Sequence, residues 1–384
     1  MKILNCLYYY RPHYSGLTVY TERLAKELAK RGHEMHILTS RYDQSLPLQA
    51  MDEGVAIERI PVAFRISKGP VMPTYVWTIL RKMAAYDVIH VHIPQIAAAP
   101  VALWGRLTKK PVVLTYHCDL RLPPTFINRF INAVSTILNR IAILMADVVV
   151  TNTRDYAEHS QVLKHRLDKV MVIPPPIEVM PFENTTLGDL KKRCGVKAGQ
   201  ILIGMAARLA TEKGAEYLAE AMTLLLEDFP QARVLYVGKY QGVMGEEDYA
   251  ARLQPLLNRL GDHWMFLGLL SSDELSAFFH MCDVTVLPSI NSTESFGMVQ
   301  VESMLSGTPV VATDIPGVRC PIRETGMGRI VRPRDAVDLA QGIRELILHL
   351  EQYPRETSAV REIYGTEAVG DQYEQLFNQI LRSQ

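Results

Sequence analysis

Short runs of β-branched and aliphatic residues alternate with longer amphipathic stretches, and this alternation limits the possible folds more than any other feature. In the first half, seven runs are typical of strands: KILNCLY, EMHILTS, VAIERIPV, DVIHVHI, PVVLTY, DVVVTN and KVMVIP. Between several of them lie stretches with apolar residues at helical spacing, such as residues 17–31. Strands that alternate with helices pair in parallel and are joined by right-handed crossovers. We therefore predict an α/β fold.

The pattern is interrupted by a proline-rich segment and then restarts. Residues 173–186 (IPPPIEVMPFENTT) contain three consecutive prolines and Pro181, which exclude a helix and indicate a linker. Six further strand-like runs follow: ILIGMAA, ARVLYVG, WMFLG, DVTVLP, PVVAT and GRIV. Helices are expected near residues 213–227, 247–260, 273–281, 297–306 and 335–350. The sequence thus predicts two Rossmann-like, doubly wound domains, residues 1–175 and 176–366, which face a cleft at the carboxyl ends of their strands.

The composition excludes several classes of protein. With 384 residues the chain suits two domains, and its 48% hydrophobic and 21% charged residues are typical of a globular protein. The five cysteines are scattered, without a Cys-x-x-Cys pair, so neither a disulfide framework nor a zinc site is expected. No apolar run has the length of a membrane span, and MKILNCLYYYRP lacks the features of a signal peptide. We expect a cytoplasmic protein.

The net charge is zero, but the charges are unevenly distributed. Residues 1–180 hold 22 Lys and Arg against 14 Asp and Glu, whereas residues 181–384 hold 19 against 27. A basic first half favours an anionic partner, either a phosphorylated acceptor or the anionic inner face of a membrane. An equally good interpretation is that two solvated surfaces differ in charge without any function. No nucleic-acid partner is expected.

The segment STESFGMVQVES, residues 292–303, carries two acids around the start of a helix. Glu294 precedes the helix and Glu302 lies eight positions later, so about two turns are expected to separate them. A carboxylate accepts two hydroxyl hydrogens and suits the vicinal diol of a sugar. Gly297 would let a ligand come close. Hydroxyl or phosphate oxygens suit the first-turn N–H groups, those of Phe296, Gly297, Met298 and Val299. Alternatively, one acid interacts with the helix dipole and the other is solvated.

A second loop, AARLATEKG, places two cations after a strand. It spans residues 206–214, and its Arg208 and Lys213 are expected at the carboxyl edge of the second sheet. Two cations in one loop suit a diphosphate better than a purely structural role.

Taken together, these pieces resemble the retaining family 4 glycosyltransferases of the GT-B fold, which use nucleotide-diphosphate sugars. The resemblance rests on ESFGMVQVE followed by SMLSGTPVVAT, on ARLATEKG, and on YYYRPHYSGLTVYTERLAKELAKRGHEMHILTS. It implies that Glu302 binds the ribose hydroxyls and that Glu294 contacts the transferred sugar. It also implies that Arg208 and Lys213 neutralise the pyrophosphate. Residues 367–384 would then form a helix that returns to the first domain.

Further site residues follow from the resemblance in the first half of the chain. His117 occupies the place of a histidine near the donor anomeric carbon, with Asp119 and Arg121 as candidate acceptor contacts. Gly16 would admit a phosphate, although the family often has two glycines there and Ser15-Gly16 is also an ordinary helix start. A single histidine after a strand is more often structural. His90 and His92 share one face of a strand without a third ligand, and we interpret them as packing or cleft-lining residues.

The expected chemistry is transfer with retention of configuration. No Asp-x-Asp or other metal-binding pattern stands out, so neither a metal nor another cofactor is expected. The leaving phosphate would accept the proton of the acceptor hydroxyl, while the two cations stabilise its charge. Alternatives with the same fold are a sugar-nucleotide epimerase and a non-catalytic sugar-nucleotide-binding subunit.

The acceptor is expected to be a saccharide or a lipid-linked molecule. The stretch RLPPTFINRFINAVSTILNRIAILMAD predicts a helix whose apolar stripe consists of Ile127, Phe130, Ile131, Val134, Leu138, Ile141 and Met145. This stripe is expected to face the core. The alternative is contact with an anionic membrane, which the basic first half would assist.

Overall fold

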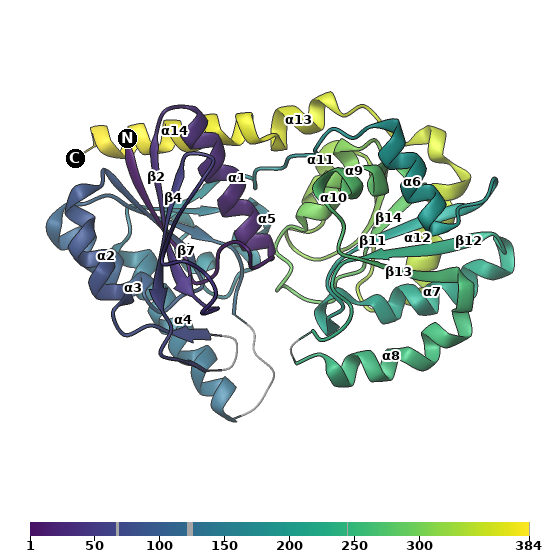
Figure 1. The fold of residues 1–384 in the computed structure, drawn as a ribbon, viewed down its shortest axis with the longest axis horizontal. Coiled ribbons are helices and arrows are strands. Elements are labelled where there is room, and N and C mark those ends of the chain that lie inside the picture. The colour runs from purple at the N-terminus through teal and green to yellow at the C-terminus, as the bar shows by residue number, and fades with distance from the viewer. Residues whose placement is uncertain (67–68, 121–125, 244, 384) are drawn as a thin grey trace. The chain divides into compact units, whose positions relative to one another are not determined.

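The computed structural model describes residues 1–66, 69–120, 126–243 and 245–383. The chain divides into two compact units (Figure 1). The first comprises Met1–Pro176 and Tyr364–Gln384, and the second comprises Ile177–Ile363.

The first unit is built on an eight-stranded sheet in the order β10-β9-β8-β7-β1-β2-β4-β3. Its strands are β1 (Lys2–Cys6), β2 (Glu34–Arg41), β3 (Gln49–Asp52), β4 (Val55–Pro61), β7 (Val88–Ile93), β8 (Val112–Tyr116), β9 (Val148–Thr151) and β10 (Val170–Val172). All seven predicted strands are present and pair in parallel. The strand β3, antiparallel to β4, and the hairpin of β5 (Phe64–Ile66) and β6 (Gly69–Val71) were not predicted.

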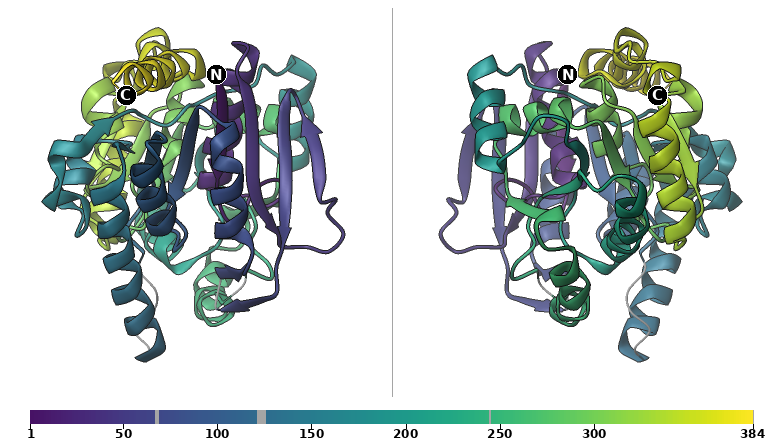
Figure 2. Two further views of the ribbon diagram at one scale, coloured as in Figure 1. Left: turned by 90° about the vertical axis from the view of Figure 1, so that its left-hand side faces the viewer. Right: turned by 90° about the vertical axis from the view of Figure 1, so that its right-hand side faces the viewer.

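Helices cover both faces of this sheet. They are α1 (Gly16–Lys30), α2 (Tyr75–Lys82), α3 (Ala98–Thr108), α4 (Phe126–Met145), α5 (Arg154–His159) and α14 (Thr366–Arg382). The strands β7, β8 and β9 step across the sheet in one direction, so right-handed crossovers place α3 and α4 on the same face. The left view of Figure 2 shows the blue helices α2, α3 and α4 next to one another.

The C-terminal helix α14 completes the first unit. It packs against α1, and in Figure 1 the yellow α14 lies alongside the purple N-terminal elements. The Tyr373 hydroxyl lies 2.6 Å from that of Tyr20 on α1 and 2.9 Å from the Thr115 hydroxyl on β8. Both tyrosines are fully buried. The expected return of the chain to the first unit is therefore confirmed.

The second unit has a six-stranded, fully parallel sheet in the order β13-β12-β11-β14-β15-β16. Its strands are β11 (Ile201–Ala206), β12 (Ala232–Val237), β13 (Trp264–Gly268), β14 (Val284–Leu287), β15 (Val310–Thr313) and β16 (Gly328–Val331). Its helices include α6 (Asn184–Cys194), α7 (Ala215–Asp228), α8 (Glu247–Leu260), α9 (Ser272–Met281), α10 (Met298–Leu305), α11 (Cys320–Thr325) and α12 (Ala336–Leu348). Every strand predicted here is present. The two Rossmann-like α/β units are confirmed.

The predicted linker was too long. Helix α6 begins at Asn184, inside the segment 173–186 that we expected to exclude a helix. The last proline of that segment is Pro181, so the residues after it are free to become helical. The helix ends at Cys194 and is capped by Gly195, which has a left-handed conformation. Its last turn is basic, as the helix dipole favours.

The apolar stripe predicted for α4 faces the core only in part. Phe130 is 69% exposed and Ile141 is also exposed, whereas Asn139 is almost fully buried. Other members of the stripe, such as Leu138, do pack against the core, and the side chain of Ile127 lies outside the described residues. The fully buried side of α4 consists of small or polar residues and one isoleucine: Ser135, Asn139, Ala142 and Ile143. Small side chains let the helix lie close to α3 and the sheet.

Candidate functional site

Two loops of the second unit meet at one edge of its sheet. They follow β11 and β14, which are neighbouring parallel strands, so both loops leave the sheet at the same edge. The N–H of Ile290 donates to the carbonyl of Glu212 at 3.1 Å, linking the loops. Gly214 has φ +67°, and a Cβ there would lie 2.1 Å from the carbonyl oxygen of Pro288. Only glycine fits this contact, which holds the two loops together.

The contact brings together two of the residues predicted from the sequence. Lys213 lies in a short 3₁₀ turn, Thr211–Lys213, and its Nζ forms an ion pair with Glu294 Oε2. Both side chains are mostly buried. The hydroxyl of Ser289 lies 3.5 Å from the same carboxylate oxygen. The cation expected at a diphosphate and the acid expected at a sugar are thus partners of one another.

The second predicted cation also has an acidic partner. Arg208 is exposed and forms an ion pair with Glu212, four residues later in the same loop. The loop is further held by Glu246, whose Oε2 accepts hydrogen bonds from the N–H and the hydroxyl of Thr211 at 3.0 and 2.9 Å. Neither acid was singled out from the sequence, because a single Glu in a polar loop gives no pattern to detect.

The segment between the two predicted acids is a loop up to Gly297 and helical from Met298 onward. Glu294 precedes helix α10 and Glu302 lies within it, as predicted, but about one helical turn rather than two separates them. Gly297 has φ +78°, and a Cβ there would lie 2.3 Å from Leu287 Cδ2. The backbone conformation and the packing against β14 therefore both require a small residue here, and the close approach of a ligand at Gly297 stays a prediction.

The remaining residues of this segment are largely enclosed. Glu302, in the middle of α10, is 6% exposed, which excludes the alternative of a solvated acid. The ring of Phe296 is buried, so only its backbone remains for ligand contact. Met298 and Val299 are half-buried, and their N–H groups belong to the first turn, which has no partners within the helix.

In the first unit, His117 follows β8 and belongs to a chain of histidines. Its Nε2 lies 3.0 Å from Nδ1 of His92, and the two rings are stacked with centroids 5.2 Å apart. The ring of Tyr20 contacts it edge-on. Burial lowers the pKa of His117 to about 3, so its imidazole is neutral near pH 7.

His90 and His92 are packing residues, as interpreted from the sequence. Both are fully buried on β7. His90 Nε2 lies 2.6 Å from the hydroxyl of Thr115, which in turn contacts Tyr373 of α14. The histidine chain is therefore connected by hydrogen bonds to the C-terminal helix. Burial lowers the pKa of His90 to about 3.

The prediction that Asp119 contacts an acceptor was wrong. Its carboxylate is buried and accepts hydrogen bonds from the hydroxyls of Tyr116 and Ser160, at 2.6 and 2.7 Å, and from the N–H of Gln161 at 3.1 Å. These three donors join β8 to the segment after α5, so the acid has a structural role. Arg121 lies outside the described residues.

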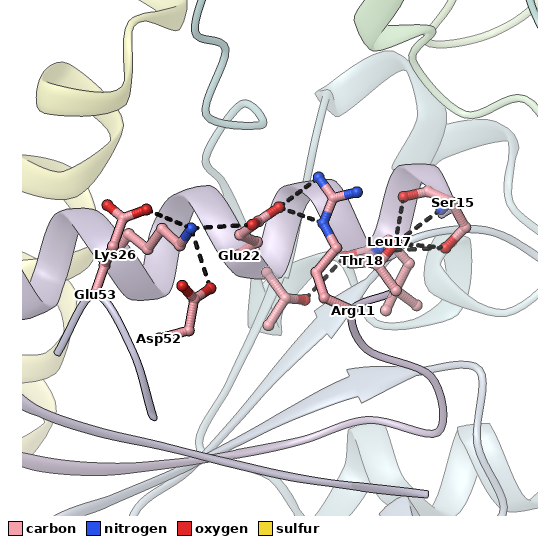
Figure 3. Close-up of polar contacts among 9 residues, drawn as sticks. Arg11, Ser15, Leu17, Thr18, Glu22, Lys26, Asp52 and Glu53 are labelled. Atoms are coloured by element: carbon pink, nitrogen blue, oxygen red, sulfur yellow. Dashed lines mark hydrogen bonds and ion pairs between the residues drawn. The ribbon is translucent and has the colours of Figure 1, made fainter. Parts of the chain in front are cut away.

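Gly16 is the first residue of α1 and has no unusual backbone conformation. Ser15 caps the helix, and its side chain accepts from the N–H of Thr18 while the Thr18 hydroxyl accepts from the N–H of Ser15. The preceding Arg11 is anchored to Glu22 at 2.5 Å (Figure 3). The cap and the ion pair thus hold the loop at both ends. The structure contains the ordinary helix start that was the alternative interpretation of Ser15-Gly16.

Figure 3 also shows Lys26, a cation of α1, among three acids. Lys26 Nζ lies 3.1 Å from Glu22 Oε1, 3.1 Å from Asp52 Oδ2 and 2.8 Å from Glu53 Oε1. The network joins α1 to the last residue of β3 and to the turn after it. It stabilises the helix that begins at Gly16.

Two family models match the two halves of the chain. Residues 189–360 match the family "Glycosyl transferases group 1", and residues 15–176 match the family "Glycosyl transferase 4-like domain". The matched ranges include both loops of the second unit and the histidine chain of the first. The chain belongs to the group 1 glycosyl transferases.

Relatives resemble this glycosyltransferase over most of its length. A D-inositol 3-phosphate glycosyltransferase of Stackebrandtia nassauensis is 29% identical over 364 residues, which cover 86% of this chain and 79% of the relative. A phosphatidyl-myo-inositol mannosyltransferase of Mycobacterium leprae is 27% identical over 341 residues, with coverages of 86% and 83%.

Solved structures confirm that the glycosyltransferase has the GT-B fold. Sucrose-phosphate synthase from Thermosynechococcus elongatus superposes with a TM-score of 0.79 at 19% identity, over 100% of both chains. Anabaena HepE, in complex with UDP-glucose, superposes with a TM-score of 0.76 at 20% identity, over 99% of this chain and 100% of HepE.

Two features are absent from the described part of the glycosyltransferase: a metal-binding cluster and a membrane-spanning helix. Within residues 1–66, 69–120, 126–243 and 245–383, no group of three or more His, Cys, Asp or Glu side chains is arranged to hold a metal ion. Among the helices of these residues, none combines the length and the apolar character needed to cross a membrane.

Proposed function

We propose that this glycosyltransferase is a retaining hexosyltransferase, which moves a hexose from a nucleotide-diphosphate sugar to a hydroxyl of a saccharide or lipid-linked acceptor. The observation that carries the proposal is the meeting of the two loops of the second unit. There, Lys213 and Glu294 are in contact near the first turn of α10, at the carboxyl edge of a parallel sheet. Such edges are the usual place for nucleotide ligands in open α/β sheets.

Donor binding is proposed to exchange the partners of the two ion pairs. A diphosphate offers Lys213 and Arg208 more negative charge than Glu294 and Glu212 do, and it accepts hydrogen bonds from both. Glu294, once released, is free to accept hydrogen bonds from hydroxyls of the hexose. Glu302 is assigned to the ribose diol, which a carboxylate can bind through both oxygens.

The chemistry is proposed to occur on one face of the sugar. The bond between the hexose C1 and the phosphate oxygen breaks while the bond between C1 and the acceptor oxygen forms on the same side. The acceptor proton passes to the departing phosphate oxygen. Lys213, Arg208 and the first-turn N–H groups of α10 stabilise the charge that develops on this phosphate.

His117 is proposed to contact the sugar by hydrogen bonding rather than through charge. Its depressed pKa keeps the ring neutral at physiological pH, so it supplies no cation to the leaving group. A neutral imidazole can accept from or donate to a hydroxyl. We therefore propose that His117 positions the hexose or the acceptor.

The reaction is proposed to need no metal, because two cationic side chains are available for the diphosphate. The donor assignment is supported by the UDP-glucose bound to Anabaena HepE, and a polyol acceptor by the names of the two inositol relatives. We propose that the reaction takes place in the cytoplasm, a reducing compartment that suits the five free thiols.

The test begins with thermal stabilisation by UDP-, GDP- and ADP-sugars, followed by transfer assays with the donor that stabilises the protein. Retention predicts that the new glycosidic bond has the anomeric configuration of the donor, which NMR coupling constants report. Activity should persist in excess EDTA. The Lys213→Met and Glu294→Gln variants should lose both donor stabilisation and turnover.

Three results would overturn parts of the proposal. An inverted product would refute the same-face mechanism. Conversion of the donor to an epimer without any acceptor would identify an epimerase instead. Stabilisation by a donor without turnover on any saccharide or lipid-linked acceptor would favour a sugar-nucleotide-binding subunit.

A further inference from the structure

We propose that the outward face of α3 and α4 is a docking surface for an anionic lipid bilayer. This surface, called here the α3/α4 apolar face, consists of large apolar side chains that are 38% to 69% exposed. Its members are Trp104, Leu107, Phe130, Ile137, Ile141 and Leu144. Isolated exposed apolar residues are normal on a protein surface, but a group of this size on adjacent helices indicates an interaction site.

The six side chains point to one side because of the fold. Helices α3 and α4 lie on the same face of the first sheet and pack against one another. On α3 the buried residues include Val101 and Ala102, and at 100° per residue Leu107 lies on the opposite side. On α4 the buried Asn139 and Ala142 are likewise on the side opposite to Leu144. Both apolar stripes therefore point away from the sheet.

The charge around this face is positive. Residues 98–146 include six Lys and Arg and a single acid, Asp119. That acid is buried and bonded to three donors, so it contributes no exposed charge. Basic residues lie on or beside both helices, at Arg106, Lys109, Lys110, Arg129 and Arg140. Each cation near an anionic bilayer contributes attraction, and the apolar side chains contribute burial in the interfacial region.

Tryptophan placement also favours a bilayer over a protein partner. Two of the three tryptophans in the chain are exposed on this side: Trp104 of α3, and Trp77 on the solvent side of α2, which packs against α3. The third, Trp264, is buried in the second unit. Tryptophan concentrates at membrane interfaces because its ring is amphipathic. From the sequence, membrane contact by α4 was the alternative to a core-facing stripe. Of the residues in that stripe, Phe130 and Ile141 belong to the α3/α4 apolar face.

The experiment is vesicle co-sedimentation of the full chain, with phosphatidylcholine vesicles and with vesicles that also contain phosphatidylglycerol. The test variant combines Ile137→Ser and Leu144→Ser. The matched control combines Met51→Ser and Val337→Ser, which are 70% and 67% exposed but lie elsewhere, on β3 and α12. Wild type should bind the anionic vesicles at least about tenfold more tightly than the neutral ones. The test variant should lose roughly tenfold or more of this affinity, and the control little.

Three outcomes would overturn the proposal. They are equal binding to both vesicle types, equal loss in test and control variants, or a dimer in light scattering that the test variant abolishes without any vesicle binding. The last would identify an interface between two copies. Unchanged thermal unfolding of the variants excludes a folding defect. The assay contains neither sugar donor nor acceptor, so its result is independent of whether the proposed transfer reaction is right.

Discussion

Replacing Gly214 by alanine tests whether the contact between the two loops of the second unit matters for both stability and donor use. The added Cβ would lie 2.1 Å from the carbonyl oxygen of Pro288, at a residue with φ +67°. The left-handed backbone alone costs an alanine about 1 kcal/mol relative to glycine. Forcing an atom into a packed backbone contact costs a further 1 to 3 kcal/mol or so. We expect a loss of about 2 to 4 kcal/mol of unfolding free energy.

Gly195 is the matched control. It has φ +61° and no heavy atom within 4 Å of an added Cβ, so Gly195→Ala isolates the backbone cost of about 1 kcal/mol. Unfolding of the second unit can be followed by the fluorescence of the buried Trp264 in urea, after Trp77 and Trp104 have been replaced by phenylalanine. The difference in unfolding free energy between the two alanine variants measures the cost of the collision with Pro288.

Donor kinetics complete this test. Because Lys213 precedes Gly214, displacement of the loop moves the cation from the place where it contacts Glu294. Only Gly214→Ala should therefore lower kcat/KM for the sugar donor, by about tenfold or more. Equal destabilisation by the two alanines would refute the packing argument. Unaltered kcat/KM in a destabilised Gly214→Ala protein would refute the link between the loop contact and donor binding.

Three further predictions concern single side chains. Lys213→Met should lower kcat by about 100-fold or more with little effect on urea unfolding, because the lost cation stabilises a leaving group; a loss confined to stability would contradict this. Burial lowers the pKa values of His90 and His117 to about 3, so their folded pKa lies below the unfolded value of about 6.5. The contribution of each histidine to the free energy of unfolding should therefore be complete above about pH 7. It should fall by about 2 kcal/mol between pH 7 and pH 5, which urea titrations at both pH values can measure. His90→Gln should reduce this dependence, and an unchanged slope would show that the histidine is not buried as a neutral group. Tyr373→Phe should cost about 1 to 3 kcal/mol in urea unfolding by leaving buried hydroxyls without a partner, whereas no change would show that the helix contact is weak.

The sheet strands were predictable because parallel strands are buried on both faces and read as short apolar runs. The antiparallel β3 was missed because its sequence, QAMD, is polar and half-exposed at the sheet edge. The face of α4 was misjudged because periodicity locates an apolar stripe but not the direction in which it points. Neighbouring helices decide that direction, and here the small residues around Asn139 are the ones buried.

The positions of the two loops of the second unit were predictable, but their mutual contacts were not. Strand ends and glycines identify the edge of the sheet, which is why Lys213 and Glu294 could be named. Their pairing depends on which strands are neighbours, and the sequence does not reveal that β11 and β14 are adjacent. Asp119 matched a family position, but its three donors come from β8 and from residues about forty positions later. Only the tertiary structure reveals that its carboxylate already accepts hydrogen bonds from these donors.

The burial of Tyr373 between α1 and β8 has a consequence for biosynthesis. The second unit is one uninterrupted segment, whereas the first is assembled from residues 1–176 and 364–384. During translation, the first unit emerges before the second but cannot form its hydrogen bonds to Tyr373 until that residue has left the ribosome. The domain that starts first is therefore finished last. Until then, the surfaces of α1 and β7 that α14 covers remain exposed, so that chaperones can bind them or they can aggregate.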